Sequence, residues 1–342
     1  MKRSNATWMA ALVLSLAVTA GLNPPAGVAG TFAPQDTVTL NAELGEFPSA
    51  AESSEPLTPA PRPSLSMFGL QSAADSDIGV PLYEQDLDQG DYGFYVMPQG
   101  LIYRSYLAGP KEPRMSAGIV SIPDDSTMWD ATIGGRLGMF RIGNSDSLRP
   151  RGFQMDVEAA AMLRLDIPEN VDVRAADYRV GFPLTWGDEF RQWKFSYYHM
   201  SSHLGDEYWE DNPEFPLYRQ ARDALVLGHS LYLTDSLRIY GEVGWAFYSV
   251  ASEPWEVQFG LDYAPRVATG LRGAPFFAAN GYLREEFDFG GGLNLQAGWA
   301  WRSDMTAHLL RLGFQYFNGH STQYAFLPLH ETQYGFVLWY DF

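Results

Sequence analysis

Residues 196–208, with the sequence SYYHMSSHLGDEY, gather side chains that could carry chemistry. They include two histidines, three serines and two acidic residues. A histidine beside a serine can act as a general base that activates the hydroxyl, provided that a carboxylate orients the imidazole. The same residue types also suit a metal site or the polar rim of a structural strand, so three alternatives stay open.

An alternating pattern decides which of these side chains lie together. Alternate residues of an extended strand share a face, so His199 and Ser201 lie on the same face as the apolar residues Trp193, Phe195 and Tyr197. An apolar face of this kind indicates a surface in contact with lipid. The pattern therefore places the histidine and the serine on the outside of a barrel, near the lipid headgroups.

The next run, RDALVLGHSLYL, supplies an acid on the equivalent face. Asp223 precedes Leu225 and Leu227 at two-residue spacing, and antiparallel pairing would bring Asp223 beside His199 and Ser201. The predicted chemistry is acyl transfer to Ser201 Oγ, with His199 as the general base and Asp223 fixing its tautomer. Rival acids lie in the intervening loop: Glu207, Glu210 and Glu214.

Two other interpretations apply to the same segment. Serine, histidine and aspartate are ordinary residues at a headgroup boundary, where they form hydrogen bonds with water and phosphate. Zinc or calcium ligation by His199, His203, Asp206 and Glu207 is disfavoured because four residues of strand span about 13 Å. We therefore expect no metal and no cofactor.

The elements that position these residues begin after an export signal. Lys2 and Arg3 precede an uncharged apolar run at 8–21, followed by small residues, which predicts a signal peptide at 1–29. A membrane anchor is disfavoured because the run is shorter than the roughly 20 residues of a spanning helix. Residues 30–91 are acidic and proline-rich, and they predict a disordered periplasmic tether.

From residue 92 to residue 342 the chain predicts a transmembrane antiparallel β-barrel of about 12 strands, an all-β fold. Apolar and polar residues alternate over successive runs, the chain is 15% aromatic, and it ends on Phe342. Ten or fourteen strands, or a soluble sandwich, are the alternatives. The expected strands are 100–120, 129–142, 152–166, 173–187, 191–204, 222–233, 236–249, 255–265, 275–285, 289–302, 307–318 and 331–342.

The polar faces of these strands should meet in a narrow lumen filled by ion-paired side chains, because about eight strands leave just enough room for side chains and sixteen leave a channel. Some outer-loop residues could also contribute polar groups at the mouth: His320, Ser321 and Gln323. A nucleic-acid partner is excluded by the net charge of −18. The expected lumen-lining residues are Arg136, Glu158, Arg164, Arg238, Glu242, Asp262, Arg302 and Arg311.

Several longer motifs carry a family resemblance. PQGLIYRSYLAGPKEPR, GGRLGMFRIG, GFQMDVEAAAMLRLD, FSYYHMSSHLGDEY and RLGFQYFNGHSTQYAF together resemble the bacterial family labelled domain of unknown function 1207. The resemblance implies an outer-membrane barrel over residues 92–342 and assigns no chemistry. Locally, His199-Met200-Ser201 resembles the His-x-Ser element of outer-membrane lipid A deacylases, although Ser202 replaces their usual asparagine.

These observations lead to a hypothesis about function with one alternative. The chain is predicted to be a barrel of the bacterial outer membrane, with a structural role or as a narrow passage for small solutes. The alternative is a hydrolase of outer-leaflet lipid esters that uses Ser201, His199 and Asp223. A third hypothesis, a secreted soluble binding protein, would hold only if the chain did not form a barrel. The expected partners are outer-membrane lipids and the barrel-assembly machinery, which would recognise the strand ending at Phe342.

Overall fold

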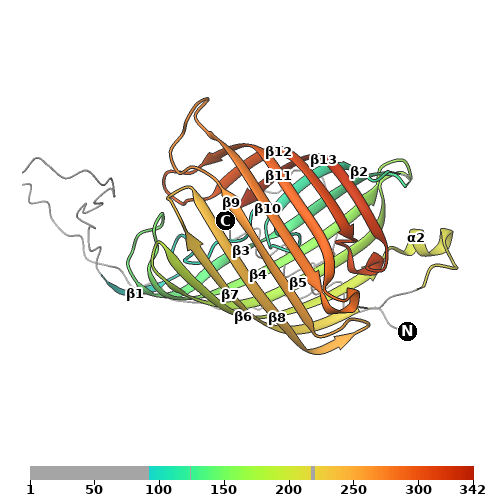
Figure 1. Ribbon diagram of the computed structural model, residues 1–342, viewed down its shortest axis with the longest axis horizontal. Coiled ribbons are helices and arrows are strands. Elements are labelled where there is room, and N and C mark those ends of the chain that lie inside the picture. Colours follow the sequence, from blue (N-terminus) through green and yellow to red (C-terminus); the bar gives the residue numbers. More distant parts are fainter. Residues whose placement is uncertain (1–91, 124, 217–219) are drawn as a thin grey trace, which may run out of the picture. The chain divides into compact units, whose positions relative to one another are not determined.

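The structure is a computed structural model that describes residues 92–123, 125–216 and 220–342. Twelve antiparallel strands, β2–β13, form a closed barrel in which each strand pairs with its neighbours in sequence and β13 pairs with β2 (Figure 1). The predicted fold class is confirmed, whereas the predicted signal peptide and tether lie outside the described residues. The strands are β2 (Met115–Ser121), β3 (Thr127–Gly143), β4 (Gly152–Asp166), β5 (Asp172–Gly187), β6 (Arg191–Leu204), β7 (Gln220–Tyr232), β8 (Leu237–Val250), β9 (Trp255–Tyr263), β10 (Ala274–Arg284), β11 (Gly290–Arg302), β12 (Leu309–His320) and β13 (His330–Asp341).

The two faces of each strand differ as the alternation predicts. On β12, Leu312 and Phe314 are 48% and 42% exposed on the outside, whereas Arg311 between the strand's apolar residues is fully buried in the lumen. Large aromatic residues pair across strands near both rims, for example Trp186 with Trp193 and Trp245 with Trp255. A barrel that is apolar outside and polar inside is the architecture of outer-membrane proteins.

The first predicted strand, 100–120, is wrong over most of its length. The structure instead has a short strand, β1 (Gly93–Val96), and β2, which both pair with β3 and so occupy one position in the barrel wall. Residues 98–114, here called the lumen segment, leave the wall between these two pieces. Ile102, Tyr106 and Ala108 are fully buried there. Pro98, Pro110 and Pro113 lie toward the two ends of this segment, where a strand ladder would lack their N–H donors.

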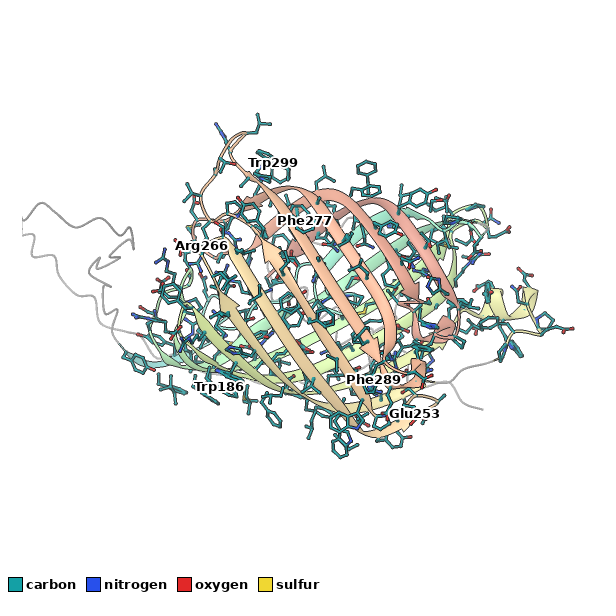
Figure 2. All side chains as sticks on the ribbon, viewed as in Figure 1. Trp186, Glu253, Arg266, Phe277, Phe289 and Trp299 are labelled. Carbon is teal, nitrogen blue, oxygen red and sulfur yellow. The ribbon has the colours of Figure 1, made fainter. Side chains whose placement is uncertain are left out.

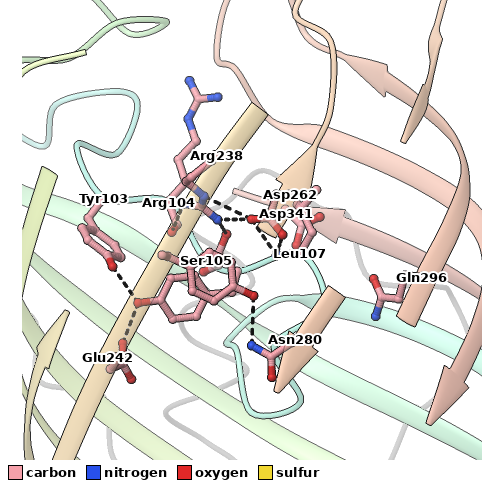
Figure 3. A network of polar contacts seen from close by, with 12 residues as sticks. Tyr103, Arg104, Ser105, Leu107, Arg238, Glu242, Asp262, Asn280, Gln296 and Asp341 are labelled. Atoms are coloured by element: carbon pink, nitrogen blue, oxygen red, sulfur yellow. Dashed lines mark hydrogen bonds and ion pairs between the residues drawn. The ribbon is translucent and has the colours of Figure 1, made fainter. Parts of the chain in front are cut away.

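Hydrogen bonds from the wall hold the lumen segment in place. Arg238 donates to the carbonyls of Arg104 and Ser105 at 2.8 and 2.7 Å, and Asp262 accepts from the backbone N–H of Leu107 (Figure 3). Further along, Asn294 Nδ2 donates to the carbonyl of Ala108 at 2.8 Å. Because polar groups of the wall satisfy its backbone, this irregular segment can lie inside the barrel.

The two ends of the barrel carry different connections. One end, here called the α2 end, has the long connection containing the short helix α2 (Asp206–Asp211) and the loop 321–329. The other, here called the Phe342 end, has shorter turns such as 188–190 and 233–236, and the longer connection 264–273. No helix among the described residues has the length and apolar character needed to cross a bilayer.

Candidate functional site

The register of β6 and β7 brings the predicted histidine and acid together. His199 lies directly opposite Asp223, and His199 Nδ1 is 2.9 Å from Asp223 Oδ1. The hydroxyl of Tyr197 donates to the same Oδ1 atom at 2.6 Å. Both donors lie on β6, so the carboxylate of Asp223 is held in one orientation by two hydrogen bonds from the neighbouring strand.

These residues lie on the outward face, as the alternation predicts. The side chains of His199 and Asp223 are 34% and 20% exposed, whereas the alternate residues Tyr198 and Met200 are buried inside. His199 is closer to the α2 end of β6 than to its other end. The pair is therefore accessible from the surroundings of the barrel, on the half of the wall nearer the α2 end.

Ser201 follows His199 on the same outward face. Its cross-strand neighbours are Ala221 on β7 and Tyr178 on β5. Among the described residues, none forms a hydrogen bond with Ser201 Oγ. The structure thus pairs His199 with Asp223 and leaves the serine hydroxyl available beside them, two residues along the strand.

This arrangement suits a histidine acting as a general base. When Nδ1 donates its proton to Asp223, the other ring nitrogen, Nε2, keeps a lone pair that can accept a proton. A carboxylate in this position also stabilises the imidazolium that forms after proton transfer. The contact between His199 and Asp223 is of the kind by which a carboxylate orients an imidazole.

The rival acids are placed elsewhere. Glu207 and Glu210 lie on α2, exposed, and Glu214 lies in the loop that follows, whereas His199 contacts Asp223. His203 contacts the ring of Tyr178 edge-on, with ring centroids 5.8 Å apart. Within the described residues, no group of three or more histidine or acidic side chains is arranged to hold a metal ion.

Aromatic residues surround the outward pair. The ring of Tyr197 stacks with Phe182 on β5 at 6.3 Å and with Phe247 on β8 at 6.2 Å. Toward the Phe342 end, Trp186 stacks with Trp193 at 6.4 Å, and Figure 2 labels Trp186 near that end. Aromatic side chains therefore flank the outward pair.

Charged side chains of the lumen form ion pairs with one another. Arg164 donates to Asp130 on one side and to Glu331 on the other, at 2.8 and 2.9 Å. The other predicted lumen residues, with one exception, also form ion pairs: Arg136 with Asp156, Glu158 with Arg179, Glu242 with Lys194, Arg238 with Asp262 and Arg311 with Asp341. The exception is Arg302, which forms no ion pair with any described residue.

The predicted outer-loop residues pack into the mouth at the α2 end. Ser321 and Gln323 are 3% and 4% exposed, and His320, the last residue of β12, stacks on the ring of Phe287 at 3.5 Å. Their loop is tied to the wall because the backbone N–H of Tyr324 donates to Asp177. These three residues therefore cover the lumen.

Sequence reasoning missed two features of these sites. Tyr197 was assigned only to the apolar face, although its hydroxyl contacts Asp223; its position two residues before His199 was the available signal. The ion pair between Lys111 of the lumen segment and Asp177 of β5 was also missed. Nothing in the alternation indicates it, because Lys111 lies outside the strands.

One protein family matches most of the chain. The family described as "Protein of unknown function (DUF1207)" matches residues 92–342. The chain belongs to this family. The matched region contains β1 and all twelve strands of the barrel. Comparison with curated proteins gives no significant match.

Solved structures similar to this DUF1207 member are bacterial outer-membrane proteins. The Salmonella typhi outer membrane phospholipase (OMPLA) dimer with bound calcium has a TM-score of 0.44 and 10% identity, covering 69% of this chain and 93% of that chain. The beta domain of the Bordetella autotransporter BrkA has a TM-score of 0.37 and 11% identity, covering 67% and 96%. A mutant Rhodopseudomonas blastica porin has a TM-score of 0.27 and 8% identity, covering 67% and 98%.

Proposed function

We propose that this chain is a barrel of the bacterial outer membrane that hydrolyses acyl esters of outer-leaflet lipids. The observation that carries the proposal is the 2.9 Å contact between His199 Nδ1 and Asp223 Oδ1 on the outward face, with Ser201 beside it. An enzyme acting on a solute in the lumen would need these side chains on the opposite face. An enzyme acting on lipid needs them where they are.

The orientation in the membrane belongs to the same proposal. Bacterial single-chain barrels have both chain ends on the periplasmic side and carry their longer loops outside. With the Phe342 end in the periplasm, the α2 end and the site lie toward the outer leaflet. Recognition by the barrel-assembly machinery through the strand ending at Phe342 fits this orientation.

The proposed reaction has two steps. Ser201 Oγ attacks the carbonyl carbon of the ester while its proton moves to His199 Nε2, and the C–O bond breaks as that proton passes to the departing alcohol oxygen. Water then attacks the acyl-serine, again losing its proton to His199, and the fatty acid leaves with Ser201 restored. Tyr178, opposite Ser201 on β5, is the proposed donor to the oxyanion that forms in each step.

A passage for small solutes has less support. The lumen segment and its hydrogen bonds lie across the interior, and the loop 321–329 covers the α2 end. Cavities lined by described lumen residues have volumes of about 20, 50, 80 and 170 Å³. Side chains therefore occupy most of the space that a solute would need.

Ser201→Ala separates the lipase proposal from a purely structural role. Purified wild-type chain, refolded into vesicles containing phospholipid or lipopolysaccharide, should release fatty acid, and the variant should release it about 10³-fold more slowly. Ser202→Ala is the matched control, because Ser202 is the next residue and faces the lumen. Mass spectrometry of released fatty acids gives the rates, and comparison of the two vesicle types identifies the lipid.

Two results would contradict the proposal. One is the absence of fatty acid release by a wild-type chain that shows the heat-modifiable gel migration of a folded barrel. The other is equal release by the Ser201→Ala and wild-type chains, which would assign any activity to a different nucleophile.

A further inference from the structure

A second polar cluster lies at the Phe342 end of the lumen, away from the outward pair. A cavity of about 50 Å³ there is lined by Tyr232 and by four arginines. Arg238 pairs with Asp262, and the other three, from different parts of the chain, are Arg104, Arg266 and Arg302. Arg104 belongs to the lumen segment, Arg266 to the connection 264–273, and Arg302 ends β11. Figure 2 labels Arg266 at the end of the barrel opposite α2. We call this cluster the arginine pocket.

The carboxylates that line the pocket are already engaged. Asp262 pairs with Arg238, and Asp341 pairs with Arg311 and with Arg114, which lies outside the pocket. The third, Asp235, is 56% exposed at its side chain and lies 3.7 Å from Arg149. Over the described ranges, Arg104, Arg266 and Arg302 form no ion pair with a carboxylate. The pocket therefore holds three positive charges without dedicated counterions.

Several guanidinium atoms in the pocket also lack hydrogen-bond partners. Arg266 Nη1 and Arg302 Nε are buried and, within the described part of the chain, have no acceptor. Arg302 Nη1 donates to the carbonyl of Ala307 at 3.2 Å, and Arg104 Nη2 donates to the carbonyl of Leu148 at 2.8 Å. These neutral acceptors hold Arg302 and Arg104 without supplying a negative charge.

The pKa values of two groups at the pocket, Arg104 and His308, are lowered by burial and by nearby positive charge. Burial, and to a smaller extent the guanidiniums of Arg266 and Arg238, lower the pKa of Arg104. Burial followed by the charge of Arg104 lowers the pKa of His308, in the turn before β12. Buried cations that repel one another are unfavourable unless an anion joins them. The cluster is therefore incomplete as it stands.

We propose that the arginine pocket binds a phosphate group. Arginine presents a planar fork of N–H donors that matches phosphate oxygens, and such charge-assisted bonds are stronger than neutral ones. Three guanidiniums converging on one cavity suit a multivalent tetrahedral oxyanion better than a single carboxylate with its two oxygens. The pocket opens at the end assigned to the periplasm, so the phosphate belongs either to a small periplasmic solute or to a lipid headgroup.

Titration calorimetry of the refolded full chain in zwitterionic detergent at low ionic strength tests the pocket. Inorganic phosphate should bind saturably at one site per chain. Arg266→Gln and Arg302→Gln should each weaken binding by about tenfold or more, as expected for losing one charge-assisted contact. Arg272→Gln is the matched control, because Arg272 is an exposed arginine of the same connection, and it should change the affinity less than twofold.

Competition then distinguishes the two sources. Displacement of phosphate by micelles containing phosphatidylglycerol, but not by phosphatidylcholine alone, assigns a lipid headgroup; displacement by glycerol 3-phosphate alone assigns a free solute. The proposal is overturned if the folded wild type shows no saturable binding. It is also overturned if Arg272→Gln weakens binding as much as Arg266→Gln, since the affinity would then be a general charge effect. Because Arg266 lies outside the strands, its replacement leaves the barrel wall intact.

Discussion

The lumen and the outward face of β6 and its neighbours use the same residue types for different ends. Inside, Lys194 and Glu242 form an ion pair at 2.6 Å with side chains only 7% and 12% exposed. Outside, His199 and Asp223 form a similar contact at 2.9 Å with 34% and 20% exposure. One residue of displacement along a strand moves a side chain from one environment to the other.

The difference teaches what each set of polar groups is for. In the lumen nearly every charge has a partner, so removing one member leaves another charge buried without compensation. On the outward face a hydroxyl remains free beside a histidine whose second nitrogen is available. We therefore expect changes inside to affect mainly stability and changes at the outward pair to affect mainly activity.

The largest stability effect should come from Arg164→Met. This change leaves Asp130 and Glu331 without their shared cation, and it should reduce the free energy of unfolding by about 3–5 kcal/mol. Urea titration of the vesicle-embedded barrel, followed by tryptophan fluorescence, measures it. Arg191→Met, at the exposed first residue of β6, should change stability by less than about 0.5 kcal/mol. Equal losses of unfolding free energy in the two variants would contradict the expected difference between lumen and surface residues.

The next effect in size concerns the outward face itself. Phe314→Arg, in the middle of β12, should cost about 2–4 kcal/mol because it places a charge in the apolar core of the bilayer. Leu310→Arg, on the same face near the Phe342 end of β12, should cost about 1 kcal/mol or less, since it lies near the interface. Urea titration in vesicles measures both changes. Similar costs in both variants would argue against the proposed depth of the strand.

The smallest effect sharpens the comparison at a single hydroxyl. Tyr106→Phe removes hydrogen bonds to Tyr103 at 2.6 Å and to Glu242 at 2.8 Å; Figure 3 labels these two partners. Unfolding in urea should show a loss of about 1–2 kcal/mol. Tyr316→Phe, on the outward face of β12, should change stability by less than about 0.5 kcal/mol. A larger loss at Tyr316 would show that outward hydroxyls also contribute to the fold.

The alternation was sufficient to predict most of the barrel. β4 and β6 begin and end where the sequence indicates, and the inward parity of Arg136 and Arg238 was correct. The failure lay at 100–114, which enters the lumen. Leu101, Ile102 and Tyr103 are consecutive apolar residues there, so this stretch does not show the two-residue alternation of the other strands.

The sequence predicted which strand face carries the candidate site, and it predicted part of the cross-strand pairing. Parity placed His199, Ser201 and Asp223 on one surface, and the pairing of His199 with Asp223 followed from joining two adjacent strands. What parity could not supply were contacts across the lumen, such as Arg164 with Glu331. Those depend on how the closed barrel brings distant strands together.

The lumen segment has a consequence for the order of assembly. Its partners are remote in sequence: the carbonyl of Leu107 accepts from Arg311, 204 residues later, and that of Ala108 from Asn294, 186 residues later. Such contacts form late, because long loops must close before they are gained. The lumen segment therefore stays undocked until β11 and β12 have formed. A barrel that closed earlier would exclude this segment from its interior.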